Sequence, residues 1–323
     1  MFDDEIILKL RKIKDLRYGE NWHQKAAFYS FCNDLYDEKN ITSLVNSEQI
    51  HGKELSLTNI LDLDSALGVV KQFDEPVVVV IKHTNPCGAA CADNITEAFE
   101  KAWAGDSLSA FGSVVGFNRK VDEKTAEKMS KRFIECVIAP DFDEDALKIL
   151  KKKKNIRLIK TGPVGKENPK IDIKKVSGGF IVQEYDNRSL EKKDLKVVTK
   201  KNPSEKELES LLFAWKILRF VKSNAIVLAK NKQVIGVGAG QMSRIDALKS
   251  ALRKAKEMGF DIKNAVLASD SFFPFRDAVD MASENGITSI MQPGGSIRDQ
   301  ESIDACNEHG ISMIFNGVRC FRH

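Results

Sequence analysis

The chain has 323 residues, of which 42% are hydrophobic and 30% are charged. This length exceeds the usual size of a single hydrophobic core and predicts two domains or lobes. The net charge of +4, from 50 basic and 46 acidic residues, is too balanced for a nucleic-acid-binding surface. The apolar runs are too short to span a bilayer and the acidic N-terminus is unlike a signal peptide, so we expect a soluble, cytoplasmic protein.

The first part of the chain alternates helices and strands. The predicted helices are 62–73, 94–104, 123–133 and 143–152, and the predicted strands are 77–81, 113–117, 136–139 and 156–159. This alternation is typical of βαβ units and predicts a mostly parallel sheet covered by helices. A Lys-rich segment from 160 to 201, interrupted by Gly and Pro, predicts the boundary between a first lobe, 1–175, and a second lobe, 176–323.

The second part begins with a helix that Ser204 and Glu207 start as a capping box. Paired strands are predicted at 225–229 and 233–237, and a helix at 243–258. Three times a helix ends at a glycine and a β-rich run follows, which is the usual helix-to-strand connection. Both lobes are therefore predicted as α/β/α layers. A weak similarity between 106–112 and 270–276 leaves open whether the lobes are two copies of one fold.

The apolar run Val77–Ile81 leads directly into Lys82-His83-Thr84-Asn85-Pro86-Cys87-Gly88. A buried strand that ends in this way presents an ammonium beside an imidazole, and Thr84–Gly88 predicts a sharp turn. Ligands of open α/β sheets bind past the carboxyl ends of strands, and a base beside a cation suits a reaction that deprotonates a nucleophile. The same residues also fit a capped strand with a solvated lysine, so both interpretations stay open.

Three further segments have two interpretations each. The glycine-rich stretch Gly236–Arg244 leads from a strand into a helix and suits either an anion site or a tight turn. The aromatic stretch Ala268–Asp277 suits either the wall of a pocket for a flat ligand or a satellite hydrophobic cluster. Arg17 and Tyr18, placed before the first predicted element, suit either a phosphate clamp or a surface turn.

The six cysteines lack paired C-x-x-C spacing, which in a chain of this length predicts reduced thiols. Pro86–Cys91 approaches the P-C-x-x-C motif of zinc deaminases, but its two cysteines are one residue too far apart. His83 also lies outside an H-x-E motif. We therefore expect no metal site.

Together these segments resemble the AICAR transformylase family, a domain that bifunctional purine-biosynthesis proteins join to IMP cyclohydrolase. The resemblance covers the chain from end to end and in order. The matching stretches are Asp15–Asn21, Lys82–Gly88, Ser109–Gly112, Lys222–Asn224, Gly238–Arg244, Ser269–Asp277, Gln292–Arg298, Met313–Phe315, Arg319 and Phe321–His323.

The resemblance implies formyl transfer from 10-formyltetrahydrofolate to the 5-amino group of AICAR, giving FAICAR in purine (IMP) biosynthesis. That amine is a poor nucleophile, because its lone pair is delocalised into the ring and the carboxamide. By this resemblance His83 is the general base and Lys82 stabilises the oxyanion of the transition state. The positions that match AICAR contacts are Arg17, Tyr18, Gly112, Glu135, Asn224 and Arg244, and those that match folate contacts are Ile245, Phe272, Asp277, Gly294, Gly295 and Arg319. Some family members have Asp at the position of Glu135 and Ser at that of Gly294.

The resemblance also implies two tandem lobes similar to cytidine deaminase without its zinc, and a homodimer with sites shared between subunits. Sixteen residues precede Arg17, where the family has its cyclohydrolase domain. We therefore expect no ring closure to IMP and a separate IMP cyclohydrolase. Two alternatives remain from other classes: a deaminase-like nucleotide hydrolase, which would contain zinc, and a non-catalytic nucleotide or folate sensor, which would bind ligand without turnover.

Overall fold

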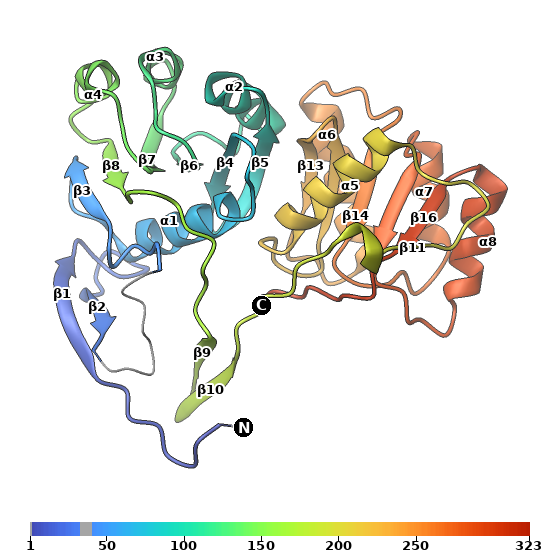
Figure 1. Cartoon of the computed structure of the whole chain (residues 1–323), viewed down its shortest axis with the longest axis horizontal. Coiled ribbons are helices and arrows are strands. Elements are labelled where there is room, and N and C mark those ends of the chain that lie inside the picture. Colours follow the sequence, from blue (N-terminus) through green and yellow to red (C-terminus); the bar gives the residue numbers. More distant parts are fainter. Residues whose placement is uncertain (1, 33–40) are drawn as a thin grey trace.

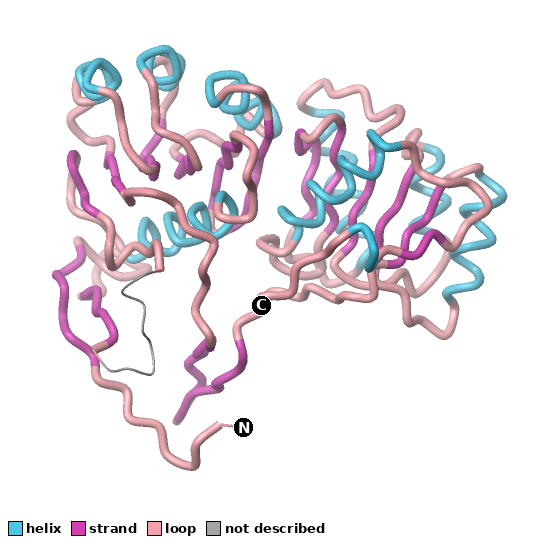
Figure 2. The backbone as a smooth tube through the Cα atoms, viewed as in Figure 1, coloured by secondary structure: helices cyan, strands magenta, loops and turns pink. Residues whose placement is uncertain are grey.

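The computed structural model of the chain describes residues 2–32 and 41–323. Within these ranges, helices cover both faces of one 12-stranded sheet, and two separate two-stranded hairpins lie away from it (Figures 1 and 2). The α/β class predicted from the sequence is confirmed. The sheet itself is mixed, so the prediction of a mostly parallel sheet is wrong.

The elements fall into two halves. The two hairpins pair β1 (Leu10–Leu16) with β2 (Ala26–Phe31), and β9 (Ile171–Val176) with β10 (Gly179–Glu184). The first half contains β3 (Glu48–His51), α1 (Leu57–Val70), β4 (Val77–Lys82), β5 (Asn85–Cys91), α2 (Ile95–Gly105), β6 (Ser113–Phe117), α3 (Glu123–Ser130), β7 (Ile134–Ala139), α4 (Glu144–Leu150) and β8 (Arg157–Lys160). The second half contains β11 (Lys196–Val197), α5 (Glu205–Leu218), β12 (Ile226–Lys230), β13 (Gln233–Gly238), α6 (Arg244–Glu257), β14 (Val266–Ser269), α7 (Asp277–Glu284), β15 (Ser289–Gln292), α8 (Asp299–His309) and β16 (Ser312–Phe315).

Local capping explains where several helices begin. Asn94 accepts a hydrogen bond from the backbone N–H of Glu97 at the start of α2, and Ser204 forms the predicted capping box of α5. The helix predicted at 62–73 instead begins at Leu57, because Ser56 caps it. Its capping-box partner is an asparagine, a weaker sequence signal than the usual glutamate or glutamine.

The two halves share one topology. From the middle of the sheet outward, the strand orders are β5-β4-β6-β7-β8-β3 and β13-β12-β14-β15-β16-β11, and corresponding neighbours run in the same relative directions. The similarity of 106–112 to 270–276 is not part of this repeat, because 106–112 precedes β6 whereas 270–276 follows β14. The predicted lobe boundary at 175/176 lies within β9, between the halves, and stays a prediction.

Three hydrophobic clusters give the protein its layers. Side chains of α1 and α5 pack in one cluster on the same face of the sheet and include Leu63, Leu211 and Trp215. The opposite face is covered by α2, α3 and α4 in the first half and by α6, α7 and α8 in the second. Figure 1 shows α1 below the strands of the first half and α2–α4 above them. Each half is therefore an α/β/α sandwich, as predicted.

The chain turns sharply after β4, as predicted, but the turn does not extend over Thr84–Gly88. The chain instead folds into a β4–β5 hairpin whose two connecting residues are His83 and Thr84, and Pro86 and Gly88 lie within β5. A Cβ atom at Gly88 would lie 2.0 Å from the carbonyl oxygen of Ala102, so this glycine allows α2 to approach the sheet. Its role is close packing rather than a positive φ.

Candidate active site

The predicted site positions lie along one edge of the sheet. Because β4 is antiparallel to β6, its carboxyl end lies beside the amino ends of β6, β7 and β8. Because β13 is antiparallel to β5, the carboxyl ends of β13–β16 reach the same edge. Lys82 and His83 lie at the carboxyl end of β4, as predicted. The parallel strands β6–β8 of the first half present their amino ends at this edge, whereas those of the second half present their carboxyl ends.

The turn that carries His83 has an unusual backbone. His83 and Thr84 have φ angles of 51° and 64°, a left-handed region that costs a residue other than glycine about 1–2 kcal/mol. Helix α1 holds this turn: Asp62 Oδ1 accepts the Thr84 N–H at 2.6 Å, and Ser65 Oγ donates to the Thr84 carbonyl at 2.9 Å. Asn85 Nδ2 donates to the His83 carbonyl at 3.0 Å. These bonds keep the exposed His83 side chain on a fixed turn.

The ammonium of Lys82 is held by the loop before β6. It donates to the carbonyl oxygens of Phe111 at 2.9 Å and Gly112 at 3.0 Å. Gly112 has a φ of 67°, and its N–H donates to the Phe133 carbonyl at 2.9 Å. The rings of Phe111 and Phe133 lie 4.8 Å apart. Lys82 is therefore anchored at a defined point instead of being free in solvent.

A basic pocket of about 450 Å³ lies next to this loop, with Phe133 in its wall. Three predicted AICAR positions line it: Arg17, Tyr18 and Glu135. The Arg17 guanidinium lies 5.4 Å from the centre of the Tyr18 ring, and this pair follows β1 instead of preceding the first element. The cationic residues that line the pocket are Arg17, Lys53, Lys131, Arg132, Lys153, Lys154 and Arg157. The arrangement suits an anionic small molecule.

Sequence reasoning missed Arg157. This residue is buried at the start of β8, where its Nε donates to the Glu54 carbonyl at 3.1 Å and its Nη1 lies 3.9 Å from a carboxylate oxygen of Glu135. The same carboxylate oxygen accepts a hydrogen bond from Asn59 Nδ2 at 3.3 Å. No local motif marks Arg157, because its importance depends on the neighbouring strand.

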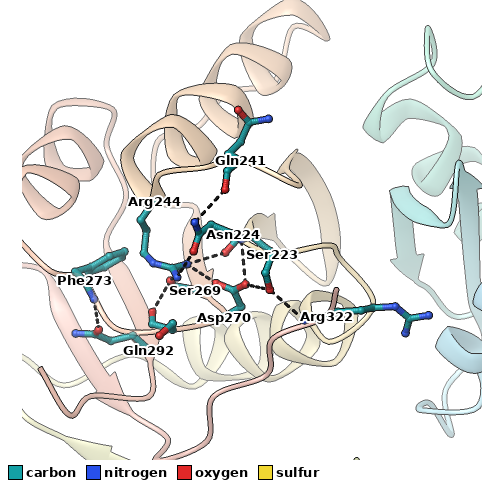
Figure 3. A network of polar contacts seen from close by, with 11 residues as sticks. Ser223, Asn224, Gln241, Arg244, Ser269, Asp270, Phe273, Gln292 and Arg322 are labelled. Atoms are coloured by element: carbon teal, nitrogen blue, oxygen red, sulfur yellow. Dashed lines mark hydrogen bonds and ion pairs between the residues drawn. The ribbon is translucent and has the colours of Figure 1, made fainter. Parts of the chain in front are cut away.

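In the second half, Arg244 lies in a buried polar network (Figure 3). Its Nη1 forms an ion pair with Asp270 and donates to Ser269 Oγ at 3.1 Å, and its Nη2 donates to Asn224 Oδ1 at 2.8 Å. Asn224 Nδ2 in turn donates to the Gln241 carbonyl at 2.9 Å. The guanidinium thus joins the strand ends that carry Asn224 and Asp270.

The glycine-rich stretch before α6 allows close packing. A Cβ atom at Gly238 would lie 1.8 Å from the Ala247 carbonyl oxygen, and one at Gly236 would lie 2.3 Å from that of Ala251. Both glycines lie within β13, so they allow α6 to pack closely against this strand. Whether the stretch binds an anion or forms only a tight turn stays a prediction.

The predicted folate positions follow strands β13 to β16. Of the phenylalanines after β14, Phe273 is buried whereas Phe272 is 37% exposed. The Phe273 N–H donates to Gln292 Oε1 at 2.8 Å, which ties this loop to β15 (Figure 3). The remaining positions lie in the first turn of α6 (Ile245), at the start of α7 (Asp277), after β15 (Gly294 and Gly295) and after β16 (Arg319).

One hydrogen bond joins the two groups of positions. The backbone N–H of Lys222 donates to Asn85 Oδ1 at 2.9 Å. It brings the segment that carries Asn224 against the hairpin that carries His83. The structure therefore places the second-half network next to the His83–Thr84 turn.

All six cysteines are free thiols, as predicted. Burial raises the pKa of Cys87, Cys91, Cys136 and Cys306 to about 12. These thiols are therefore protonated at neutral pH and are poor nucleophiles. Among residues 2–32 and 41–323, no three or more His, Cys, Asp or Glu side chains gather as a metal site would require. Within the same ranges, no helix combines the length and apolar character needed to cross a membrane.

These features define an α/β protein with a lysine–histidine pair at a sheet edge and a basic pocket beside it. The chain belongs to the AICARFT/IMPCHase bienzyme family, whose model matches residues 1–254. This membership confirms the resemblance to the AICAR transformylase family.

Several curated relatives match the whole chain. It is 53% identical over 322 residues to the bifunctional purine biosynthesis protein PurH of Caldicellulosiruptor saccharolyticus, covering 100% of this chain and 61% of that protein. It is 50% identical over 323 residues to PurH of Aquifex aeolicus, covering 100% of this chain and 62% of that protein. The chain thus spans 61–62% of the length of these relatives.

A solved structure also aligns with part of the chain. It is a diaminohydroxyphosphoribosylaminopyrimidine deaminase/5-amino-6-(5-phosphoribosylamino)uracil reductase of Thermotoga maritima, with 21% identity and a TM-score of 0.25. The alignment covers 34% of this chain and 35% of that one. A TM-score this low carries no argument, so the likeness to cytidine deaminase stays a prediction.

Proposed function

We propose that this chain transfers the formyl group of 10-formyltetrahydrofolate to the 5-amino group of AICAR, giving FAICAR. The observation that carries the proposal is the placement of Lys82 and His83. Lys82 ends β4 and His83 begins the fixed turn that follows it. The loop that binds Lys82 contacts Phe133, and Phe133 lines the basic pocket. Membership of the AICARFT/IMPCHase family supports the same activity.

The proposed reaction needs a base and a cation at one point. His83 removes a proton from the 5-amino group as the amine nitrogen bonds to the formyl carbon. The bond from that carbon to N10 of the folate then breaks, and the proton on His83 passes to N10. Two of the three donors of the Lys82 ammonium bind the carbonyls of Phe111 and Gly112, which leaves one for the developing oxyanion.

The pocket suits the nucleotide. Its volume of about 450 Å³ falls within the range of small-molecule sites, and its cations complement a phosphate. In this proposal Arg17, Tyr18, Gly112, Glu135, Asn224 and Arg244 contact AICAR. The folate contacts are Ile245, Phe272, Asp277, Gly294, Gly295 and Arg319.

Further expectations belong to the same proposal. The enzyme is a cytoplasmic homodimer whose sites are shared between subunits, and it requires no metal ion. Size measurement in solution and metal analysis test the dimer and the metal independence.

The decisive test is a formyl-transfer assay with AICAR and 10-formyltetrahydrofolate, followed by the absorbance of released tetrahydrofolate. We expect the wild-type protein to turn over, and we expect Lys82→Ala and His83→Ala to lower that turnover strongly. Stoichiometric zinc together with ammonia release from a nucleotide would instead support the deaminase-like hydrolase. Tight binding of both ligands without turnover would support the sensor.

A further inference from the structure

Helix α1 presents three polar side chains toward the candidate site, spaced three residues apart. Asn59 donates to Glu135, whereas Asp62 and Ser65 bind the backbone of Thr84. Residues three apart lie side by side on a helix, so these groups form one row. Much of the rest of α1 is buried in the apolar core. A polar row within such a helix indicates a specific task.

The carboxylate of Asp62 has the closest relation to the proposed base. Its Oδ1 accepts the Thr84 N–H at 2.6 Å, the shortest of the bonds that hold the His83–Thr84 turn. Both turn residues have positive φ, so this conformation depends on the bonds made to it. Asp62 also interacts electrostatically with His83 and Lys82. It can therefore act on the position of the imidazole through the turn that carries it.

We propose that Asp62 is a positioning residue, which fixes the turn that carries His83 by accepting the Thr84 N–H. The inference rests on the proposed function, because it assigns a task within that reaction. Asp62 touches neither substrate nor reacting atoms in this scheme. Its effect passes through the backbone of Thr84.

The charged surroundings of Asp62 support this assignment. Burial raises the pKa of Asp62, although the Thr84 N–H, His83 and Lys82 each act in the opposite direction. Lys82 comes from β4 and His83 from the turn, and Cys136 of β7 is a neutral thiol because burial raises its pKa to about 12. A carboxylate with a raised pKa weakens the folded state as pH rises through that pKa. Asp62→Asn is therefore expected to fold.

The kinetic test compares Asp62→Asn and Asp62→Ala with the wild type. Asn keeps an oxygen for the Thr84 N–H but loses the charge, and we expect kcat to fall about tenfold. Ala loses both, and we expect a fall of about a hundredfold, the effect of slight misplacement of a reacting group. KM for both substrates should change less than about twofold in each variant, because Asp62 binds neither. Asp64→Asn is the matched control, since Asp64 lies on the same helix but lines a different cavity, and it should keep wild-type kcat.

The split between kcat and KM separates positioning from substrate binding or a merely structural role. Unchanged kcat in Asp62→Asn would overturn the proposal. An equal loss of kcat in Asp64→Asn would overturn it as well. If Asp62→Ala does not fold, Asp62→Asn still decides the question.

An NMR measurement makes the result independent of turnover. The five histidines of the chain allow the His83 imidazole signal to be assigned by comparison with His83→Gln. We expect Asp62→Asn to shift that signal relative to wild type at fixed pH and Asp64→Asn to leave it unchanged. A shifted His83 signal in a protein that transfers no formyl group would refute the proposed function alone. Active wild-type protein with the same His83 signal in Asp62→Asn would refute the Asp62 proposal alone.

Discussion

Removing the Asp270 carboxylate tests whether the buried network in Figure 3 holds the second half of the site together. Asp270 is 0% exposed, and Arg244 is 8% exposed. The carboxylate accepts hydrogen bonds from Ser223 Oγ at 2.6 Å and from the Ala225 N–H at 3.1 Å, besides pairing with Arg244. Asp270→Ala leaves the guanidinium buried without its counter-charge. It also removes the acceptor for two further donors.

Breaking a buried ion pair by removing one partner costs about 3–5 kcal/mol, because the other charge stays buried. We therefore expect Asp270→Ala to lower the free energy of unfolding by that amount. With a urea dependence of about 2–3 kcal/mol per M, the unfolding midpoint falls by about 1–2 M. Urea unfolding followed by circular dichroism measures this shift. The matched control is Asp261→Ala, which removes an exposed partner of Lys230 and should cost less than about 1 kcal/mol.

A double-mutant cycle separates the ion pair from other losses at this position. Arg244→Met also removes one partner, whereas the double variant leaves no unpaired charge. We expect the double variant to be less destabilised than the sum of the single variants by about 2 kcal/mol or more. Additive losses would refute the reasoning. A free energy of unfolding of Asp270→Ala within about 1 kcal/mol of wild type would refute it as well, because burying an unpaired guanidinium costs more than that.

Three other predictions follow from single sites. His83→Ala should lower kcat by about two to four orders of magnitude, which is the range for loss of a general base. It should leave the urea midpoint unchanged, because the side chain is exposed. A loss of kcat below about tenfold would contradict the proposed role of His83. Gly238→Ala should lower the free energy of unfolding, measured in urea, by about 1–3 kcal/mol, because its Cβ would lie 1.8 Å from a backbone oxygen of α6. Gly179→Ala is the control, since a Cβ there meets no atom within 4 Å. Alkylation at pH 8, read by mass spectrometry, should modify Cys32 in the native protein and the other five thiols only in urea. Burial raises the pKa of four of those five thiols to about 12, so their reactivity should increase as pH rises toward that value. Rapid labelling of several thiols in the native protein would contradict this prediction.

The elements that the sequence predicts best are those with local signals. Ser204 and Asn94 cap helices where expected, and the paired strands β12 and β13 lie within a residue of their predicted bounds. Gly259, Gly286 and Gly310 follow helices in the left-handed conformation. In each case the physical cause lies within a few residues, so the sequence contains it.

The hairpin at His83 shows why other features escape prediction. A two-residue turn with positive φ at both positions favours Asn, Asp or Gly, and neither His83 nor Thr84 gives that signal. The sequence pointed instead to Pro86 and Gly88, which lie in a strand. Bonds from Asp62 and Ser65, about twenty residues earlier in the chain, hold the turn. Its conformation is therefore a tertiary effect.

The site residues divide in the same way. Family motifs point to Lys82 and His83 from the sequence alone, because the motif is contiguous. The motif does not reveal Arg157, Asp62 and Asp270, since each of these residues acts on a group that is distant in the chain. Only their neighbours in space reveal a task.

By itself the sequence determines the α/β class, most helices and strands, the reduced thiols and the family. Tertiary structure decides the direction of the strands and the position of the site. Hydrogen bonding between distant strands sets those directions, and local patterns of apolar residues are the same for parallel and antiparallel neighbours that are buried on both faces. The antiparallel contact of β5 with β13 brings the amino ends of one half and the carboxyl ends of the other to a common edge.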